Sequence, residues 1–95
     1  MPGPFDPFAW IPRGHQQLTS ITTATSLTVP PAARMCIMNC ENQSVRWLDD
    51  GSAPSSTLGM LMKAADPSLI YYGWPGNIQV VAQQTGAILN VAYYG

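Results

Sequence analysis

Most of the chain consists of short apolar or β-branched runs separated by turn residues. Around residues 16–23 the side chains alternate, with Thr and Ile at successive positions, and this pattern is typical of a strand. Further runs of this kind lie at residues 27–29, 34–40, 45–48, 58–62, 69–72, 78–82 and 87–94. Short strands with turn signals roughly every eight to twelve residues predict an all-β protein, a single-domain β-sandwich of jelly-roll type.

Residues 34–40 are almost continuously apolar, which predicts a central strand buried on both faces, with Met38 in the core. The turn residues at 41–44 predict a hairpin that pairs this strand with residues 45–48, and we expect Trp47 to be buried as well.

The region that follows is rich in Asp, Gly, Ser and Pro. We expect residues 49–56 at the surface, and the loop is long enough to cross from one sheet to the other. Residues 57–65 could be mistaken for a helix, but Gly59 disfavours one, so we interpret 58–62 as a strand. A second hairpin turn is predicted at 83–86.

Residues 1–14 differ from the β domain predicted over residues 15–95. Prolines at positions 2, 4, 7 and 12 exclude a helix and predict an extended arm. The aromatic residues of this arm are Phe5, Phe8 and Trp10. It is either a passive tail or a strap that docks on a neighbouring subunit, and exposed aromatic side chains favour the strap.

The composition indicates a protein that works in an assembly. Charged residues make up only 9% of the chain and hydrophobic residues 46%, so an isolated subunit would have little charge to prevent association. The net charge is −1 and the four basic residues are scattered along the chain without forming a basic stripe, which argues against nucleic-acid binding. No apolar run is long enough for a membrane helix, and we expect neither an anchor nor a signal peptide.

Few residues could support catalysis or bind a metal. His15 is the only histidine, and we interpret it as a surface or interface residue. Cys36 and Cys40 would lie roughly 13 Å apart on one strand, which is too far for a disulfide, so we predict that both are free, buried thiols. Free thiols agree with synthesis of the protein in a reducing cytosol. The acidic pair Asp49 and Asp50 fits a turn better than a calcium loop, because no further acid follows at ligand spacing. We expect no enzyme activity and no cofactor.

Aromatic residues offer an alternative function. The residues concerned are Trp10, Trp47, Trp74, Tyr71, Tyr72, Tyr93 and Tyr94. Adjacent strand residues point to opposite faces, so one tyrosine of each pair would be exposed and could stack on a sugar. The partner-binding residues that we predict are Phe5, Phe8, Trp10, Arg13 and Trp74.

Residues 14–95 resemble a family of small tailed-bacteriophage proteins. The resemblance rests on the segments 14–18, 27–30, 45–55, 58–60 and 89–94, and most distinctively on the loop sequence WLDDGSAPS. The family consists of β-sandwich capsid decoration, or cement, proteins. The resemblance implies a non-enzymatic virion structural protein made in the host bacterial cytoplasm, a homotrimer that joins neighbouring major capsid proteins on the outer capsid surface. The alternative is a host-recognition module of a tail fibre or spike that binds a surface glycan or receptor.

Overall fold

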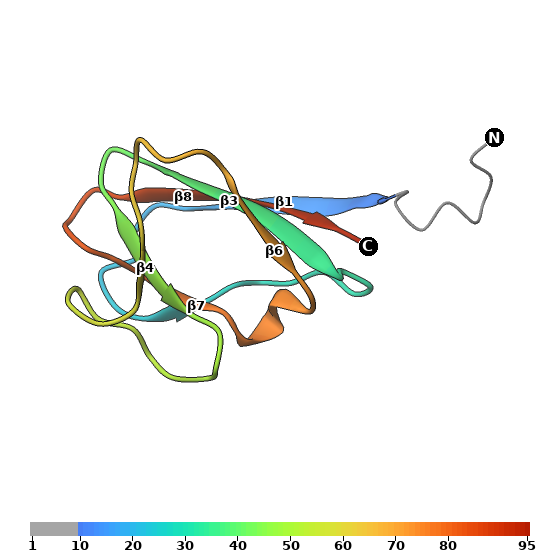
Figure 1. Cartoon of the computed structure of the whole chain (residues 1–95), viewed down its shortest axis with the longest axis horizontal. Coiled ribbons are helices and arrows are strands. Elements are labelled where there is room, and N and C mark those ends of the chain that lie inside the picture. The colour runs from blue at the N-terminus through green and yellow to red at the C-terminus, as the bar shows by residue number, and fades with distance from the viewer. Residues whose placement is uncertain (1–9) are drawn as a thin grey trace.

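The computed structural model describes residues 10–95, which form two four-stranded antiparallel sheets (Figure 1). The strands are β1 (Pro12–Leu18), β2 (Thr25–Ser26), β3 (Met35–Glu41), β4 (Val45–Leu48), β5 (Met60–Met62), β6 (Leu69–Tyr72), β7 (Gln79–Ala82) and β8 (Ile88–Tyr94). Within the described residues the only helical element is a 3-10 turn, η1 (Pro75–Asn77). No helix in residues 10–95 has the length and apolar character that crossing a bilayer requires. The all-β prediction is therefore confirmed.

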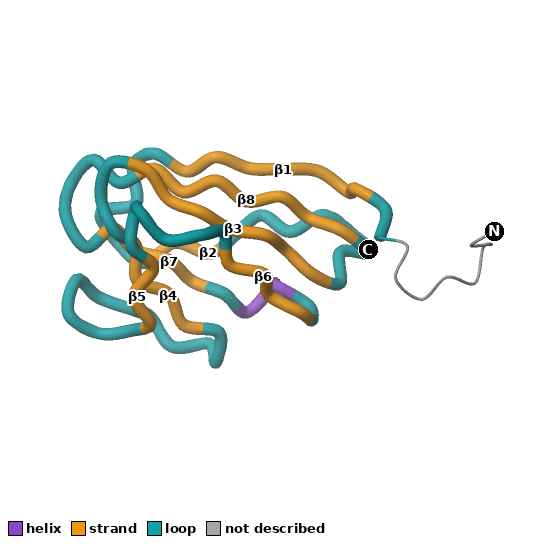
Figure 2. Tube along the Cα trace, turned by 45° about the horizontal axis from the view of Figure 1, so that its top comes forward, coloured by secondary structure: helices purple, strands orange, loops and turns teal. Residues whose placement is uncertain are grey.

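The strands pair from the two ends of the chain inward. β1 pairs with β8, β2 with β7, β3 with β6 and β4 with β5, as in one long hairpin whose turn lies between β4 and β5. Additional pairs, β3 with β8 and β4 with β7, wrap this hairpin into two sheets, ordered β1-β8-β3-β6 and β2-β7-β4-β5 (Figure 2). Each sheet therefore combines strands from both halves of the chain.

The core lies between the two sheets and is apolar. In β8 the residues that alternate inward are Leu89, Val91 and Tyr93, each at most 2% exposed. The other sheet contributes Val45 and Val80, both fully buried. Burying each side chain of this kind stabilises the fold by about 1.5–3 kcal/mol, and in residues 10–95 no buried side-chain polar atom lacks a hydrogen-bond partner.

Strand β3 is central, as predicted, because it lies between β8 and β6. Met38 is fully buried, which confirms its place in the core. Trp47 is only half-buried: it packs at the margin of the core, edge-on to Tyr71 with ring centroids 6.0 Å apart. Cys36 and Cys40 are both buried and free, as predicted.

Three predicted connections between strands were wrong. Residues 42–44 join β3 in one sheet to β4 in the other, so they form no hairpin, and residues 83–87 likewise join β7 to β8 across the sheets. The loop at 49–59, expected to cross, instead connects β4 and β5 within one sheet. Turn residues reverse the chain both in a hairpin within one sheet and in a connection between two sheets. They therefore do not specify which strand the next strand pairs with. The two crossings lie side by side, because Gln83 N–H donates to the Ser44 carbonyl over 2.9 Å.

The first strand begins earlier than the sequence predicted. β1 starts at Pro12, so residues 12–14, expected in the arm, are part of the sheet, and the strand ends at Leu18 instead of residue 23. Proline is tolerated because β1 is an edge strand and because the register shifts between Pro12 and Gly14, whose φ is 145°.

Two other strands differ in position or length. β2 occupies Thr25–Ser26 where residues 27–29 were predicted. β5 is confined to Met60–Met62 where 58–62 was predicted, because Gly59 has a φ of 127° and ends the extended conformation.

Alkaline pH should destabilise the protein through its buried thiols. Burial raises the pKa of Cys36 from 9.0 to about 11. The unfolded thiol ionises near pH 9 while the native thiol stays protonated, so stability should fall as pH rises from about 9 to about 11. Urea midpoints measured across this range test the prediction. Cys36→Ala should reduce the change of the urea midpoint with pH only in part, since burial also raises the pKa of Cys40 and Tyr93. A midpoint that is constant with pH would contradict the prediction.

Candidate interaction surfaces

Exposed apolar side chains gather along β5 and β6, which are the outermost strands of their sheets. They are Leu58, Met60, Leu61, Ile70 and Tyr72, with exposed fractions of 58, 58, 38, 47 and 69%. We call these five side chains the apolar edge. β5 and the segment that enters β6 flank a cavity of about 240 Å³, so β5 lies close to the beginning of β6.

The cavity and the strand beside it are suited to a protein partner. Apolar side chains of β4, β5 and β6 line most of the cavity, and Asp66, Pro67 and Ser68 complete its lining. Among the described residues, β6 pairs only with β3, so its outer backbone edge has no partner strand. Its sequence, Leu-Ile-Tyr-Tyr, contains neither a charge nor a proline. Natural proteins usually protect such an edge with charges, prolines or bulges, and the apolar edge has none of these.

Trp10 lies next to the apolar edge. Its ring is 6.5 Å from that of Tyr72, and the guanidinium carbon of Arg34 is 5.1 Å from the centre of the Trp10 ring. The neighbouring backbone is fixed by two hydrogen bonds between Ile11 and Gly95, with N···O distances of 3.0 and 2.9 Å. Trp10, predicted as an anchor for a neighbouring subunit, is thus half-buried against its own chain.

The other predicted partner-binding residues are spread over the chain. Phe5 and Phe8 lie outside the described residues. Arg13 is exposed on β1. Trp74 is 53% exposed, and its indole lies against Gly76, where an added Cβ would overlap the ring. A glycine at position 76 therefore allows the Trp74 ring to adopt this orientation.

The acidic loop has the hydrogen bonds of a turn. Asp50 Oδ1 accepts the Ser52 backbone N–H over 2.9 Å, and hydrogen bonding to Ser52 lowers the pKa of Asp50. Asp49 Oδ2 accepts the Tyr71 hydroxyl over 2.7 Å, which raises the pKa of Tyr71 to about 12. The two carboxylates thus have separate partners: Asp50 caps an amide within the loop, as the turn interpretation predicts, whereas Asp49 bonds to Tyr71 on β6. In residues 10–95 no three His, Cys, Asp or Glu side chains are grouped closely enough to hold a metal ion.

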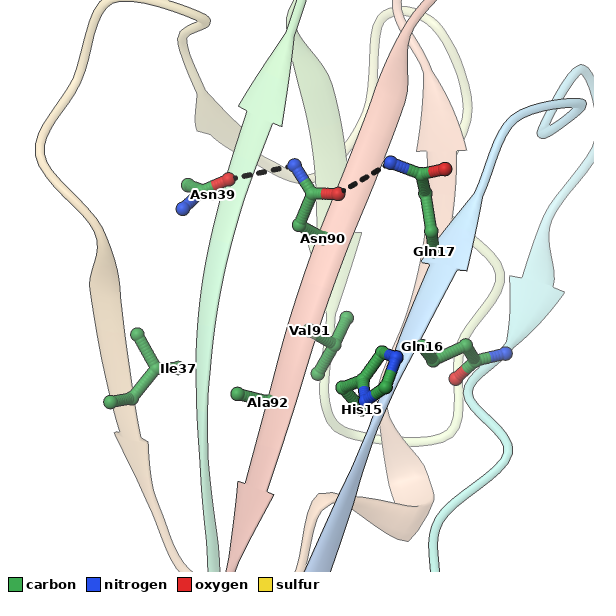
Figure 3. Close-up of a pocket in the computed structure, with 8 residues that line it drawn as sticks. All are labelled: His15, Gln16, Gln17, Ile37, Asn39, Asn90, Val91 and Ala92. Atoms are coloured by element: carbon green, nitrogen blue, oxygen red, sulfur yellow. Dashed lines mark hydrogen bonds between the residues drawn. The ribbon is translucent and has the colours of Figure 1, made fainter. Parts of the chain in front are cut away.

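A second surface, not predicted from the sequence, lies on the outer face of β1, β8 and β3. Amide side chains from the three strands form a hydrogen-bonded row beside a hollow that His15 also lines (Figure 3). Gln17 and Asn90 are 73 residues apart, so only the strand register brings them together.

Comparison with known protein families, with curated proteins and with solved structures finds no match to this chain. The apolar edge and the amide row are therefore interpreted from their own chemistry.

Replacing Gly76 should move one tryptophan ring. In Gly76→Ala the new methyl group would overlap the Trp74 indole, so the ring must leave its present position. We expect a shift of the Trp74 indole N–H resonance in NMR spectra, and destabilisation of about 1 kcal/mol at most, because the ring is half-exposed. The Trp10 and Trp47 resonances serve as internal controls. An unchanged Trp74 signal would contradict the contact.

Proposed function

We propose that this protein is a decoration subunit of a tailed-phage capsid, without enzymatic activity, that binds through its apolar edge. The observation that carries the proposal is an uncharged edge strand, β6, bordered by exposed apolar side chains. On a chain with only 9% charged residues, such a surface would promote non-specific association unless a partner covered it. The resemblance of residues 14–95 to capsid decoration proteins supports the same role.

We infer that the two sheets form a jelly-roll β-sandwich. A jelly roll contains eight strands in two packed sheets, and the orders β1-β8-β3-β6 and β2-β7-β4-β5 are those of a rolled eight-strand hairpin. A shared core between the sheets supports the sandwich arrangement. Such a domain offers rigid edges for assembly.

The apolar edge could supply enough binding energy for decoration. Each of its five side chains would contribute up to about 1.5–3 kcal/mol if it were buried from full exposure. The five side chains are already partly buried, which lowers this free energy, and the entropy lost when the interface is ordered lowers it further. A micromolar dissociation constant corresponds to about 8 kcal/mol, which is within reach if backbone pairing along β6 adds to side-chain burial.

The partners follow from the resemblance. We propose the major capsid protein as the binding partner and a homotrimer as the working unit, on the outer surface of the virion. The chemistry of the described residues is compatible with a structural role: among them no carboxylate is hydrogen-bonded to His15, and the two loop carboxylates accept the Ser52 amide and the Tyr71 hydroxyl.

Charge at the apolar edge should weaken decoration. In Ile70→Lys and Met60→Lys an ammonium group would have to be buried where an apolar side chain was, so we expect occupancy of capsid shells to need at least tenfold more protein. Tenfold corresponds to about 1.4 kcal/mol, less than the loss of one fully buried side chain. Co-sedimentation with shells of the phage that encodes this chain measures the effect.

The matched control for these variants is Gln84→Lys, which adds the same charge in an exposed connection away from the edge. It should decorate shells like the unaltered protein. If Ile70→Lys and Met60→Lys remain folded and also decorate shells normally, the apolar edge is not the binding surface.

Removing residues 1–9 should separate folding from assembly. All eight strands lie within residues 10–95, so the far-UV circular dichroism should be unchanged. If the arm straps neighbouring subunits, we expect at least a tenfold loss of trimer formation or shell occupancy, measured by analytical ultracentrifugation and co-sedimentation. Trp10→Ala should have a smaller effect, because Trp10 packs partly on its own Tyr72. A truncated protein that assembles normally would show that the arm is a passive tail.

A further inference from the structure

The outer face of β1, β8 and β3 contains a hollow of about 370 Å³. It forms because Ala92 of β8 pairs with two larger neighbours, His15 on β1 and Ile37 on β3. Figure 3 shows these two side chains on either side of Ala92. The volume lies near the lower end of the range for small-molecule sites, about 300–1,000 Å³.

A row of amides closes one end of the hollow. Gln17 Nε2 donates to Asn90 Oδ1 over 2.9 Å, and Asn90 Nδ2 donates to Asn39 Oδ1 over 3.0 Å (Figure 3). Asn90 Nδ2 also donates to Glu41 Oε2 over 2.7 Å, and Asn39 Nδ2 donates to Ser68 Oγ over 3.2 Å. These bonds fix the orientation of each amide before any ligand arrives.

The row retains unused hydrogen-bonding groups. Both Asn90 N–H groups are engaged, but one N–H of Gln17 and one of Asn39 remain free to donate. Gln17 Oε1 and the imidazole of His15 have no hydrogen-bond partner within residues 10–95. Donors and acceptors therefore lie next to each other beside an apolar surface formed by Ala92 and Ile37.

This arrangement matches a sugar better than an anion. Sugar hydroxyls both donate and accept, as amides do, and the C–H groups of a pyranose ring can pack on Ala92 and Ile37. No Lys or Arg lines the hollow, and the Glu41 carboxylate bonded to Asn90 would repel an anion.

We propose that the hollow binds a neutral hexopyranose unit of an oligosaccharide. This site borders the apolar edge, because Ile37, which lines the hollow, pairs with Ile70 of β6. It goes beyond the decoration role and does not depend on it.

Amide signals in NMR spectra test the proposal directly. The full chain, labelled with nitrogen-15, is titrated with maltohexaose, cellohexaose and mannohexaose, each up to about 10 mM, a range that detects weak binding. We expect at least one sugar to shift the side-chain NH₂ signals of Gln17, Asn39 and Asn90 with a dissociation constant of about 1 mM. Absence of shifts with all three sugars, or shifts confined to other residues, would overturn the proposal.

Two variants and one control make the test specific. Ala92→Leu fills the hollow from an outward-facing strand position, and Gln17→Ala removes the free N–H and the free Oε1 of Gln17. Both should weaken sugar binding at least tenfold while the backbone spectrum stays that of the folded protein. Gln84→Ala, in the exposed connection between β7 and β8, should bind like the unaltered chain.

If the two hollow variants bind sugar normally, the hollow is not the site. The sugar titrations use the free protein without capsid shells, so a failure of the sugar site can be distinguished from a failure of the decoration role.

Discussion

The pairing of β8 with both β1 and β3 is the interaction on which the other features depend. β8 lies inside its sheet, and its two faces have different roles: Leu89, Val91 and Tyr93 fill the core, while Asn90 and Ala92 form the outer hollow and the amide row. A shift of register by one residue would exchange these faces. The core and the proposed sugar site are therefore specified by the same backbone hydrogen bonds.

The two candidate surfaces differ in chemistry because they lie on different strands. β6 and β5 are edge strands with exposed apolar side chains, which suits a stable protein contact. The face over β1, β8 and β3 presents pre-oriented amides, which suits a weak and reversible polar ligand. The two surfaces adjoin, because Ile37 of the hollow pairs with Ile70 of the apolar edge.

The sequence predicted most strands but not their partners. Runs such as 35–41 and 88–94 are recognisable because apolar side chains repeat with the period of a strand. The short connections after β3 and β7 look like hairpin turns, and only pairing with distant strands shows that they cross between sheets. For the same reason the amide row was missed, and contact between Trp10 and Tyr72 could not be foreseen.

The position of β8 also has a consequence for how quickly the protein folds. Contacts such as Gln17 with Asn90 join residues 73 apart, and proteins dominated by such non-local pairs fold in milliseconds to seconds. A ribosome makes the residues of β8 after those of every other strand. Until then β1 and β3 lack the strand that they both pair with, while the apolar strand β6 has already been made. Newly made chains thus have an interval in which association with each other competes with folding.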